Sequence, residues 1–272
     1  MRDEVTVIAL PMVESDWDDY VSTKGRDLGG AACAHTESPI VFYNGANFIG
    51  GAEGFVQWVA DQYEYEDKTP ASVYQDIASA EYDAHLRSLG HQFVYMDVTV
   101  GEGDAERVVF ELFSDVCPKT CENFRALCTG ERGTAALPDE GKVDLTYERC
   151  MFHRVVKGGW VQGGDIVSGA GDGGFSIYGE DFPDESFAVA HGGPGVLAMA
   201  NCGPHTNASQ FFVSLRALDF MNKNAVAFGR VVSGMGAIRR LAAVETENER
   251  PTVPCRVAAC GQLALASEEQ KE

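Results

Sequence analysis

The fold is decided by the stretch Phe152-His153-Arg154-Val155-Val156-Lys157-Gly158-Gly159-Trp160-Val161-Gln162-Gly163-Gly164-Asp165. Apolar and β-branched residues on both sides of its glycine-rich turn predict two strands, at 151–156 and 160–166. The same pattern continues outward along the chain. It predicts helices at 118–128 and 235–244 and further strands at 93–100, 107–113, 195–201, 210–215, 225–232 and 256–263. Many antiparallel strands with two helices imply a closed barrel capped at its ends.

Further landmarks flank this stretch in a fixed order. Phe110-Glu111-Leu112-Phe113 and Cys117-Pro118-Lys119-Thr120-Cys121-Glu122-Asn123-Phe124 precede it. Ser176-Ile177-Tyr178-Gly179, Ala198-Met199-Ala200-Asn201, Asn207-Ala208-Ser209-Gln210-Phe211-Phe212 and Val226-Ala227-Phe228-Gly229 follow it. Together these segments resemble the cyclophilin family of peptidyl-prolyl cis-trans isomerases. The resemblance implies a mostly β fold, an eight-stranded barrel with two capping helices, and a substrate that is a proline-containing peptide or protein.

The reaction of such an isomerase requires few functional groups. Rotation about an X-Pro bond breaks amide resonance, at a barrier of about 20 kcal/mol. It needs no nucleophile, metal or proton transfer, so we expect no cofactor. It needs a donor aimed at the proline nitrogen of the twisted amide. Arginine suits this role because its guanidinium stays charged and its fork is rigid. The resemblance gives the role to Arg154; the alternative is an arginine that only covers the barrel surface.

The resemblance also assigns the substrate contacts. Gln162 matches the residue that holds the substrate carbonyl, the backbone of Asn201 matches the one that grips the residue before proline, and Phe212 matches the floor of the proline pocket. These three and Arg154 are the expected catalytic residues. His153 matches a position that shapes the binding groove; the alternative is a histidine that only holds the scaffold through hydrogen bonds. The expected substrate-binding residues are His153, Trp160, Ala200, Gln210, Phe220 and Met221.

Several positions depart from the family pattern. Gly159 stands where a pocket phenylalanine is usual, and Trp160 where methionine is usual. Phe220 replaces the tryptophan at the rim, Met221 the adjacent leucine, and Ala225 the histidine on the far side. Losing a pocket phenyl removes a large apolar contact. We therefore expect weakened isomerase activity and poor sensitivity to cyclosporin, with Trp160 filling part of the gap.

Composition restricts the partners and the compartment. The net charge is −20; residues 1–90 carry 5 basic and 16 acidic residues, and residues 91–272 carry 16 and 25. This charge disfavours nucleic acid and anionic membranes as partners. No apolar run is long enough to span a membrane, and the N-terminal one is too short for a signal peptide. We expect a cytoplasmic protein whose eight cysteines are thiols. The six histidines form no ligand cluster, so no metal site is expected.

The N-terminal part predicts a separate small α/β domain at 1–68, followed by a linker helix at 69–90, the cyclophilin domain at 91–266 and a tail at 267–272. Its expected elements are a strand at 5–10, a helix at 15–27, strands at 39–43 and 46–49 joined by Asn44-Gly45, and a helix at 53–65. The segment 38–51 is similar to the later half of glutaredoxins, in which a cis proline precedes the strand. Cys33 stands without a second redox cysteine, so we expect a redox-inactive docking module. The alternative is an unrelated α+β domain.

Details of the sequence resemble one divergent cyclophilin branch with an added N-terminal region. They are the segment 159–166, the pair Cys117 and Cys121, and Asn248-Glu249-Arg250-Pro251. That branch is associated with motile cilia and their axonemes. Two functions therefore compete: an isomerase with weakened activity, and a scaffold protein of the axoneme that binds partners through its barrel and N-terminal module. The longer loop at 130–147 is expected to be a surface insertion, with a partner contact as the alternative. A thiol oxidoreductase is disfavoured because the cysteine pair is missing.

Overall fold

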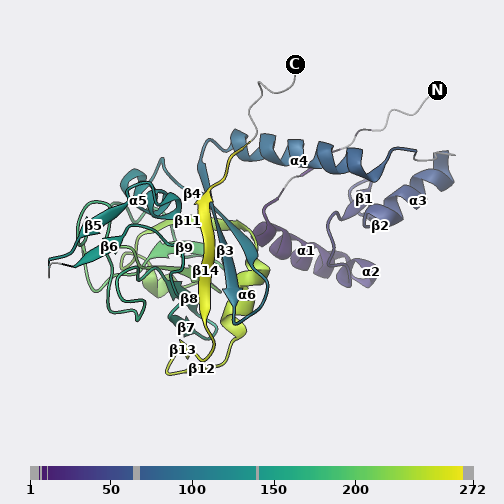
Figure 1. The fold of residues 1–272 in the computed structure, drawn as a ribbon. Helices are drawn as coiled ribbons and strands as arrows, with labels where there is room; N and C mark the ends of the chain where they lie inside the picture. The colour runs from purple at the N-terminus through teal and green to yellow at the C-terminus, as the bar shows by residue number, and fades with distance from the viewer. Residues whose placement is uncertain (1–5, 7, 11, 64–67, 139–140, 266–272) are drawn as a thin grey trace, which may run out of the picture. The chain divides into compact units, whose positions relative to one another are not determined.

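The computed structural model describes residues 6, 8–10, 12–63, 68–138 and 141–265 of the 272-residue chain. The chain divides into two compact units (Figure 1). One reaches as far as Ser88, and the other comprises Leu89–Leu265.

The second unit is built on an eight-stranded antiparallel sheet with the strand order β14-β3-β4-β11-β9-β10-β8-β7 (Figure 1). Backbone hydrogen bonds also join the segment before β7 to β14: Phe152 donates to Cys255, and Val257 donates to Cys150. These bonds curl the two ends of the sheet together and confirm the expected barrel. The strands are β3 Gln92–Val100, β4 Glu106–Leu112, β7 Arg154–Val156, β8 Trp160–Gly163, β9 Val196–Met199, β10 Phe211–Ser214, β11 Ala227–Ser233 and β14 Cys255–Gln262.

Two helices pack against the sheet, as expected. Helix α5, Pro118–Thr129, begins with proline at its first position and ends at Gly130, whose φ of 68° suits glycine. Helix α6 is Met235–Ala243. The side chain of Phe124 from α5 lies at the centre of the main core. Its ring contacts four aromatic rings from the sheet and its connections, those of Phe110, Tyr147, Phe211 and Phe228.

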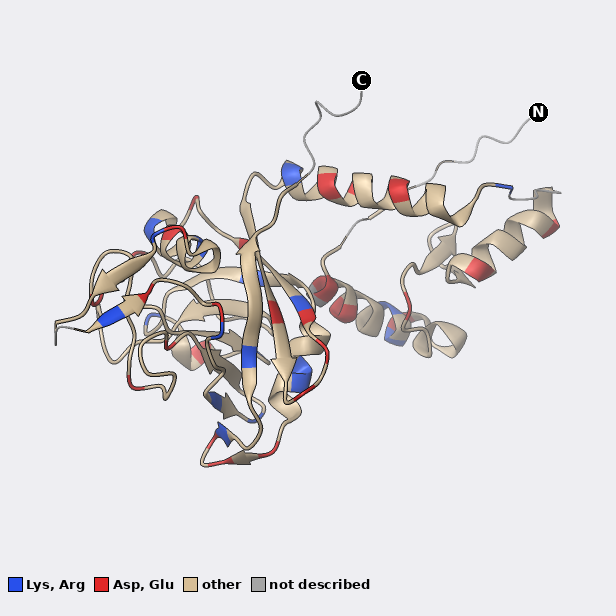
Figure 2. Cartoon of the chain, viewed as in Figure 1, with Lys and Arg blue, Asp and Glu red and all other residues tan. Residues whose placement is uncertain are grey.

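Two hairpins project from the sheet. The loop at 130–147 folds into β5, Thr134–Ala136, and β6, Lys142–Asp144, which pair with each other. Near the end of the chain, β12, Thr246–Glu247, pairs with β13, Arg250–Pro251. The β12–β13 hairpin carries charges of both signs (Figure 2). Between the sheet strands Asp219–Met221 form one turn of 3₁₀ helix.

The first unit contains the helices α1 Glu14–Leu28, α2 Gly30–Cys33, α3 Ala52–Tyr63 and α4 Ala71–Ser88, with β1 Val41–Tyr43 paired to β2 Asn47–Gly50. Asn44 and Gly45 both have positive φ, but Tyr43 pairs with Asn47, so the turn contains the three residues 44–46 and not the predicted two. The Ser38-Pro39 peptide bond is cis. The short helix α2 was not predicted. Of the expected strand at 5–10, residues 5 and 7 lie outside the described residues, and the others are not in a strand.

Charged residues of both signs are distributed over both units (Figure 2). None of the helices in the described part of the chain is long and apolar enough to cross a membrane.

Candidate functional site

Backbone register places the main candidate residues side by side. Arg154 of β7 pairs with Gln162 of β8, Gln162 pairs with Phe212 of β10, and Phe212 pairs with Ala198 of β9. Directly paired residues on antiparallel strands have their Cβ atoms about 4.5–5.5 Å apart and point to the same face. A guanidinium, an amide and a phenyl ring therefore follow one another across three strands. We call Arg154, Gln162 and Phe212 the site row.

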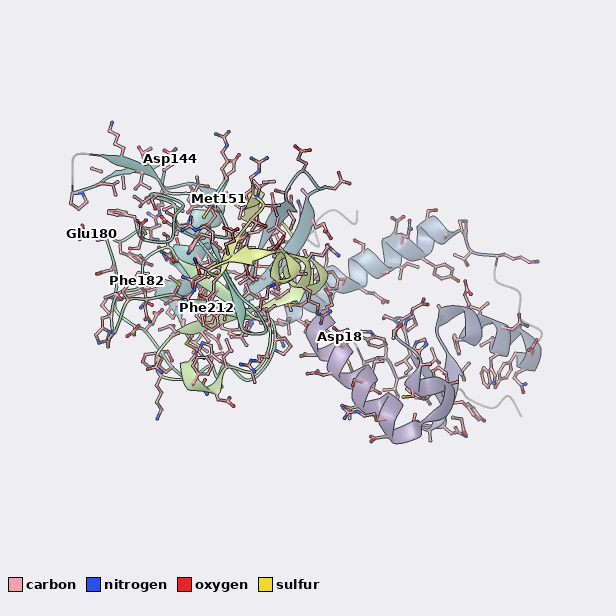
Figure 3. The ribbon with its side chains drawn as sticks, turned by 90° about the horizontal axis from the view of Figure 1, so that it is seen from below. Asp18, Asp144, Met151, Glu180, Phe182 and Phe212 are labelled. Carbon is pink, nitrogen blue, oxygen red and sulfur yellow. The ribbon has the colours of Figure 1, made fainter. Side chains whose placement is uncertain are left out.

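The two faces of these strands have different surroundings. Val155, Val161 and Phe211 alternate with the site row and belong to the main core. Phe212 lies among the strands of the second unit (Figure 3), but its side chain belongs to a separate buried cluster. The other buried members of this second cluster are small or aliphatic, so Phe212 is the aromatic ring around which they pack, and it is itself buried. These other members are Ala198, Leu218, Ala225 and Ala227, with Trp160, Ala200 and Met221 packed against them.

Trp160 connects all three residues of the site row. Its ring lies over that of Phe212, with the centroids 5.8 Å apart. Its Nε1 donates a hydrogen bond to Oε1 of Gln162 at 3.3 Å. The guanidinium carbon of Arg154 lies 5.4 Å from the centre of the indole ring, within cation–π range. The indole therefore contacts the phenyl ring, the amide and the guanidinium of the site row at once.

The Gln162 amide is engaged on its other side as well. Its Nε2 donates to Oε1 of Gln210 at 2.9 Å, and Nε2 of Gln210 donates to the carbonyl oxygens of Gly171 and Gly173. Gln210 is therefore brought next to the site row, as the resemblance implies. It links the row to the loop after Asp165.

Asp165 holds this loop in shape. Its carboxylate accepts hydrogen bonds from the backbone N–H groups of Val167, Ser168, Gly171 and Gly173 and from the Ser168 hydroxyl. Burial alone would raise the pKa of Asp165, but these hydrogen bonds outweigh burial and lower the pKa well below its ordinary value. The carboxylate therefore stays charged and structural at neutral pH.

Arg154 has a partner that the sequence did not suggest. Its Nε donates to Oε2 of Glu249 at 2.7 Å. Glu249 stands in the two-residue turn of the β12–β13 hairpin, far along the chain. The turn dipeptide Asn248-Glu249 was noted only as a family resemblance. The charge of Arg154 is the sequence feature from which such a contact could be predicted, because a cationic side chain favours an acidic neighbour.

Two buried histidines border the site row. His153 is 7% exposed, and burial lowers its pKa from the ordinary value. His191, which the sequence analysis missed, is fully buried; its ring stacks on Phe212 with an angle of 15° between the planes. Burial lowers its pKa as well. Both rings are therefore uncharged near pH 7.

The remaining candidates lie around this centre. Nδ2 of Asn201 donates to the carbonyl of Asn224, so its side chain is fixed. Ala200 and Met221 pack against the Phe212 cluster. Phe220, by contrast, is 60% exposed and is not part of that cluster. It does not reproduce the enclosed rim that an indole would give.

Gly164, directly after β8, lies where the chain passes close to the start of β10. Its φ is 91°, and a Cβ atom there would clash with the Ser209 carbonyl oxygen and lie 2.8 Å from the Phe211 ring. Only glycine allows the backbone of the segment after Gln162 to pass so close to the start of β10.

The sequence of this unit matches a known family. A family model described as "Cyclophilin type peptidyl-prolyl cis-trans isomerase/CLD" matches residues 95–262. This range covers more than half of the chain and contains the whole site row. The chain belongs to the cyclophilin family. The predicted family and fold are thereby confirmed, and the barrel can be called a cyclophilin domain.

Three mammalian relatives match nearly the whole chain. The human protein is 40% identical over 254 residues, which is 93% of this chain and 80% of the relative. The bovine protein is 40% identical over 257 residues, with 94% and 82% covered. The mouse protein is 39% identical over 256 residues, with 94% and 80% covered. All three are named "Probable inactive peptidyl-prolyl cis-trans isomerase-like 6". The similarity to these isomerase-like 6 proteins confirms the predicted likeness to a divergent cyclophilin branch with an added N-terminal region.

Proposed function

We propose that the cyclophilin domain binds X-Pro segments at the site row and isomerises them with reduced efficiency. The observation that carries this proposal is the register that sets Arg154, Gln162 and Phe212 side by side. Phe212 offers an apolar surface for the proline ring. Arg154 supplies a charged donor for the proline nitrogen as its lone pair localises. Gln162 supplies an amide for the neighbouring carbonyl.

The same geometry supports the reduced efficiency. Gln162 donates to Gln210 and accepts from Trp160, and the indole covers part of Phe212. A peptide must exchange these internal contacts for its own, and that cost reduces the free energy left for stabilising the twisted amide. Each loss of about 1.4 kcal/mol lowers the rate about tenfold. The names of the mammalian relatives, which describe those proteins as probably inactive, agree with this direction.

Exchange NMR on a proline peptide with comparable cis and trans populations tests the proposal directly. The wild-type protein should accelerate exchange measurably, and Arg154→Ala should abolish most of that acceleration. Arg256→Ala is the matched control, since it removes an exposed arginine from β14. Equal rates with wild type and Arg154→Ala would reject the proposed role of the site row.

A second candidate is a scaffold of the ciliary axoneme that uses the same face only for binding. It is favoured by the internal bonds of Gln162 and by Gly159, Phe220 and Ala225 at positions where the family usually has larger or more polar side chains. In this reading residues 1–68 form a redox-inactive, thioredoxin-like docking module, residues 69–90 a linker helix, and residues 91–266 the binding domain. The order α1, β1, β2, α3 and the lack of a second cysteine in the sequence of residues 1–68 support the module.

Localisation separates the second candidate from a general cytoplasmic isomerase. A tagged full-length chain expressed in a ciliated cell should concentrate along the axoneme. Deleting residues 1–68 should disperse it while leaving the cyclophilin domain folded. Uniform cytoplasmic signal from the full-length chain would count against the axonemal scaffold.

A further inference from the structure

The turn that carries Glu249 has a backbone that disfavours glutamate. Glu247 and Arg250 pair directly, so the hairpin turns on two residues, Asn248 and Glu249. Their φ angles are 49° and 65°. Two-residue turns with both φ values positive prefer asparagine followed by glycine. Asn248 follows this preference and Glu249 does not. A residue kept in a disfavoured backbone region points to a role for its side chain.

The hairpin is tied to the strand that carries Arg154. The carbonyl oxygen of Glu249 accepts a hydrogen bond from the backbone N–H of Val155 at 2.7 Å. Nη2 of Arg250 donates to the carbonyl oxygen of Ala170 at 2.6 Å. These two bonds fix the turn beside β7. They hold the Glu249 carboxylate within reach of Arg154, which directly precedes Val155.

The ion pair acts on the group that the proposed function needs. The carboxylate takes the Nε–H of Arg154, and the Trp160 ring lies near the guanidinium. Glu249 is the only hydrogen-bond partner that the described residues offer to this guanidinium. A guanidinium paired with a carboxylate is a weaker donor toward a peptide, because part of its charge is neutralised. The carboxylate also repels an approaching carbonyl oxygen.

The pair is weak enough for a ligand to open. The side chains of Arg154 and Glu249 are 44% and 45% exposed. Ion pairs this exposed contribute at most about a fivefold factor to an equilibrium constant. A lysine or arginine side chain on the ligand could therefore take the carboxylate and release Arg154. The net charge of −20 favours the approach of such a ligand.

We propose that Glu249 is a latch residue: it restrains Arg154 in the free protein, and a basic side chain next to the ligand's proline releases it. Glu249 acts through Arg154, so it is a positioning residue and sets a preference for basic proline segments. This inference rests on the proposed function, because it assumes that Arg154 meets the ligand.

The test compares two peptides on three full-length proteins. The peptides are acetyl-Ala-Ala-Pro-Ala-amide and acetyl-Lys-Ala-Pro-Lys-amide. The proteins are wild type, Glu249→Gln and the matched control Glu247→Gln, which removes the same charge from the neighbouring strand residue. Glutamine at 249 keeps the shape and the unfavourable φ, so only the charge changes. Dissociation constants come from NMR titration, together with the Arg154 Nε–H signal.

Glu249→Gln should bind the neutral peptide about two- to fivefold more tightly, and the advantage of the lysine peptide should shrink by a similar factor. The Arg154 Nε–H signal should shift in Glu249→Gln without any ligand. Glu247→Gln should keep the wild-type ratio between the two peptides. Equal effects of the two variants, or weaker binding by Glu249→Gln, would overturn the latch.

The outcomes separate the latch from the proposed function. Binding that requires Arg154 but ignores Glu249 would overturn the latch alone. Tighter binding by Glu249→Gln without any turnover would uphold the latch and remove catalysis from the proposed function. Failure of both peptides to bind any of the three proteins would overturn both.

Discussion

The indole ring of Trp160 lies over the phenyl ring of Phe212, with the centroids 5.8 Å apart and the planes at 51°. The protein therefore covers its own apolar floor with a side chain from the next strand. Under the proposed function this contact affects ligand binding, because the proline ring would pack on the same phenyl ring.

Replacing the indole should open that surface. Trp160→Met removes the ring from Phe212 and the donor from Gln162, while keeping an apolar side chain. Aromatic pairs contribute about 0.5–1.5 kcal/mol beyond burial, so proline-peptide affinity should rise about two- to tenfold. NMR titration measures it, with Trp58→Met in the first unit as control. Weaker binding by Trp160→Met would show that the indole belongs to the ligand site.

Phe212 should matter for stability as well as for binding. It is 3% exposed, whereas Phe220 is 60% exposed. Phe212→Ala should lower the free energy of unfolding by about 3–5 kcal/mol, and Phe220→Ala should change it by less than about 0.5 kcal/mol. Urea denaturation followed by circular dichroism gives both values. A similar small loss for the two variants would contradict the burial of Phe212.

Salt should act on the ion pair between Arg154 and Glu249. Because both side chains are nearly half exposed, added salt screens their attraction. Affinity for the neutral proline peptide should therefore rise about twofold between low salt and 0.5 M sodium chloride. In Glu249→Gln this rise should vanish. Fluorescence titration at several salt concentrations checks it, and a fall in wild-type affinity would contradict the expectation.

The cysteines should divide sharply in reactivity. Cys33 and Cys202 are exposed. Burial raises the pKa of Cys117 and Cys260 to about 11, and that of Cys150 to about 12. In the native protein at pH 8, a thiol reagent should label two cysteines in a fast phase. The double variant Cys33→Ser/Cys202→Ser should lack this fast phase. Rapid labelling of the double variant would refute it.

The same pKa shifts predict loss of stability in alkali. The folded state keeps thiol protons that the unfolded state releases near pH 8.5. With respect to these thiols, the free energy of unfolding should therefore stay constant below about pH 8.5 and fall as the pH rises toward 11. Urea midpoints measured from pH 7 to 10.5 check this direction. A midpoint that rises through that interval would contradict it.

Asp165 predicts the behaviour in acid. Its pKa is lowered in the folded state, so its contribution is present above the unfolded value near pH 3.9 and lost as the pH falls below it. Asp165→Asn should lower the free energy of unfolding by about 2 kcal/mol at pH 7, because charged acceptors are lost. It should also flatten the acid limb of the stability profile. An unchanged acid limb would reject the role of Asp165.

Sequence patterns predicted the cyclophilin domain well, because strand alternation, Pro118 and the glycine turns are local signals that tertiary packing reinforces. The predicted strand at 151–156 is shorter in the structure, starting at Arg154, because Met151 pairs only with Arg256 across the closed barrel. In the first unit the helix predicted at 15–27 is followed directly by the unpredicted α2, which begins at Gly30. Glycine is only a weak guide there, since it both ends and begins helices.

The structure sets the candidate residues side by side, through contacts that the sequence did not predict. Arg154, Gln162 and Phe212 were assigned by motif. Their partners Glu249 and His191 come from distant segments, and no local spacing connects them to the motif. Contacts that depend on barrel closure cannot be inferred from a local pattern. Trp160 was expected to fill part of the gap at Gly159, and its ring lies against that of Phe212.

The close approach of Gly164 to the start of β10 bears on the register between β8 and β10. Because side chains alternate between faces, a slip of one residue between β8 and β10 would turn Gln162 into the core and leave Phe212 without its neighbour. Gly164 has no side chain to block the observed alignment, and this alignment sets Arg154, Gln162 and Phe212 side by side. Loops such as the β12–β13 hairpin can then vary in sequence, and so adjust ligand preference, without shifting the strands beneath them.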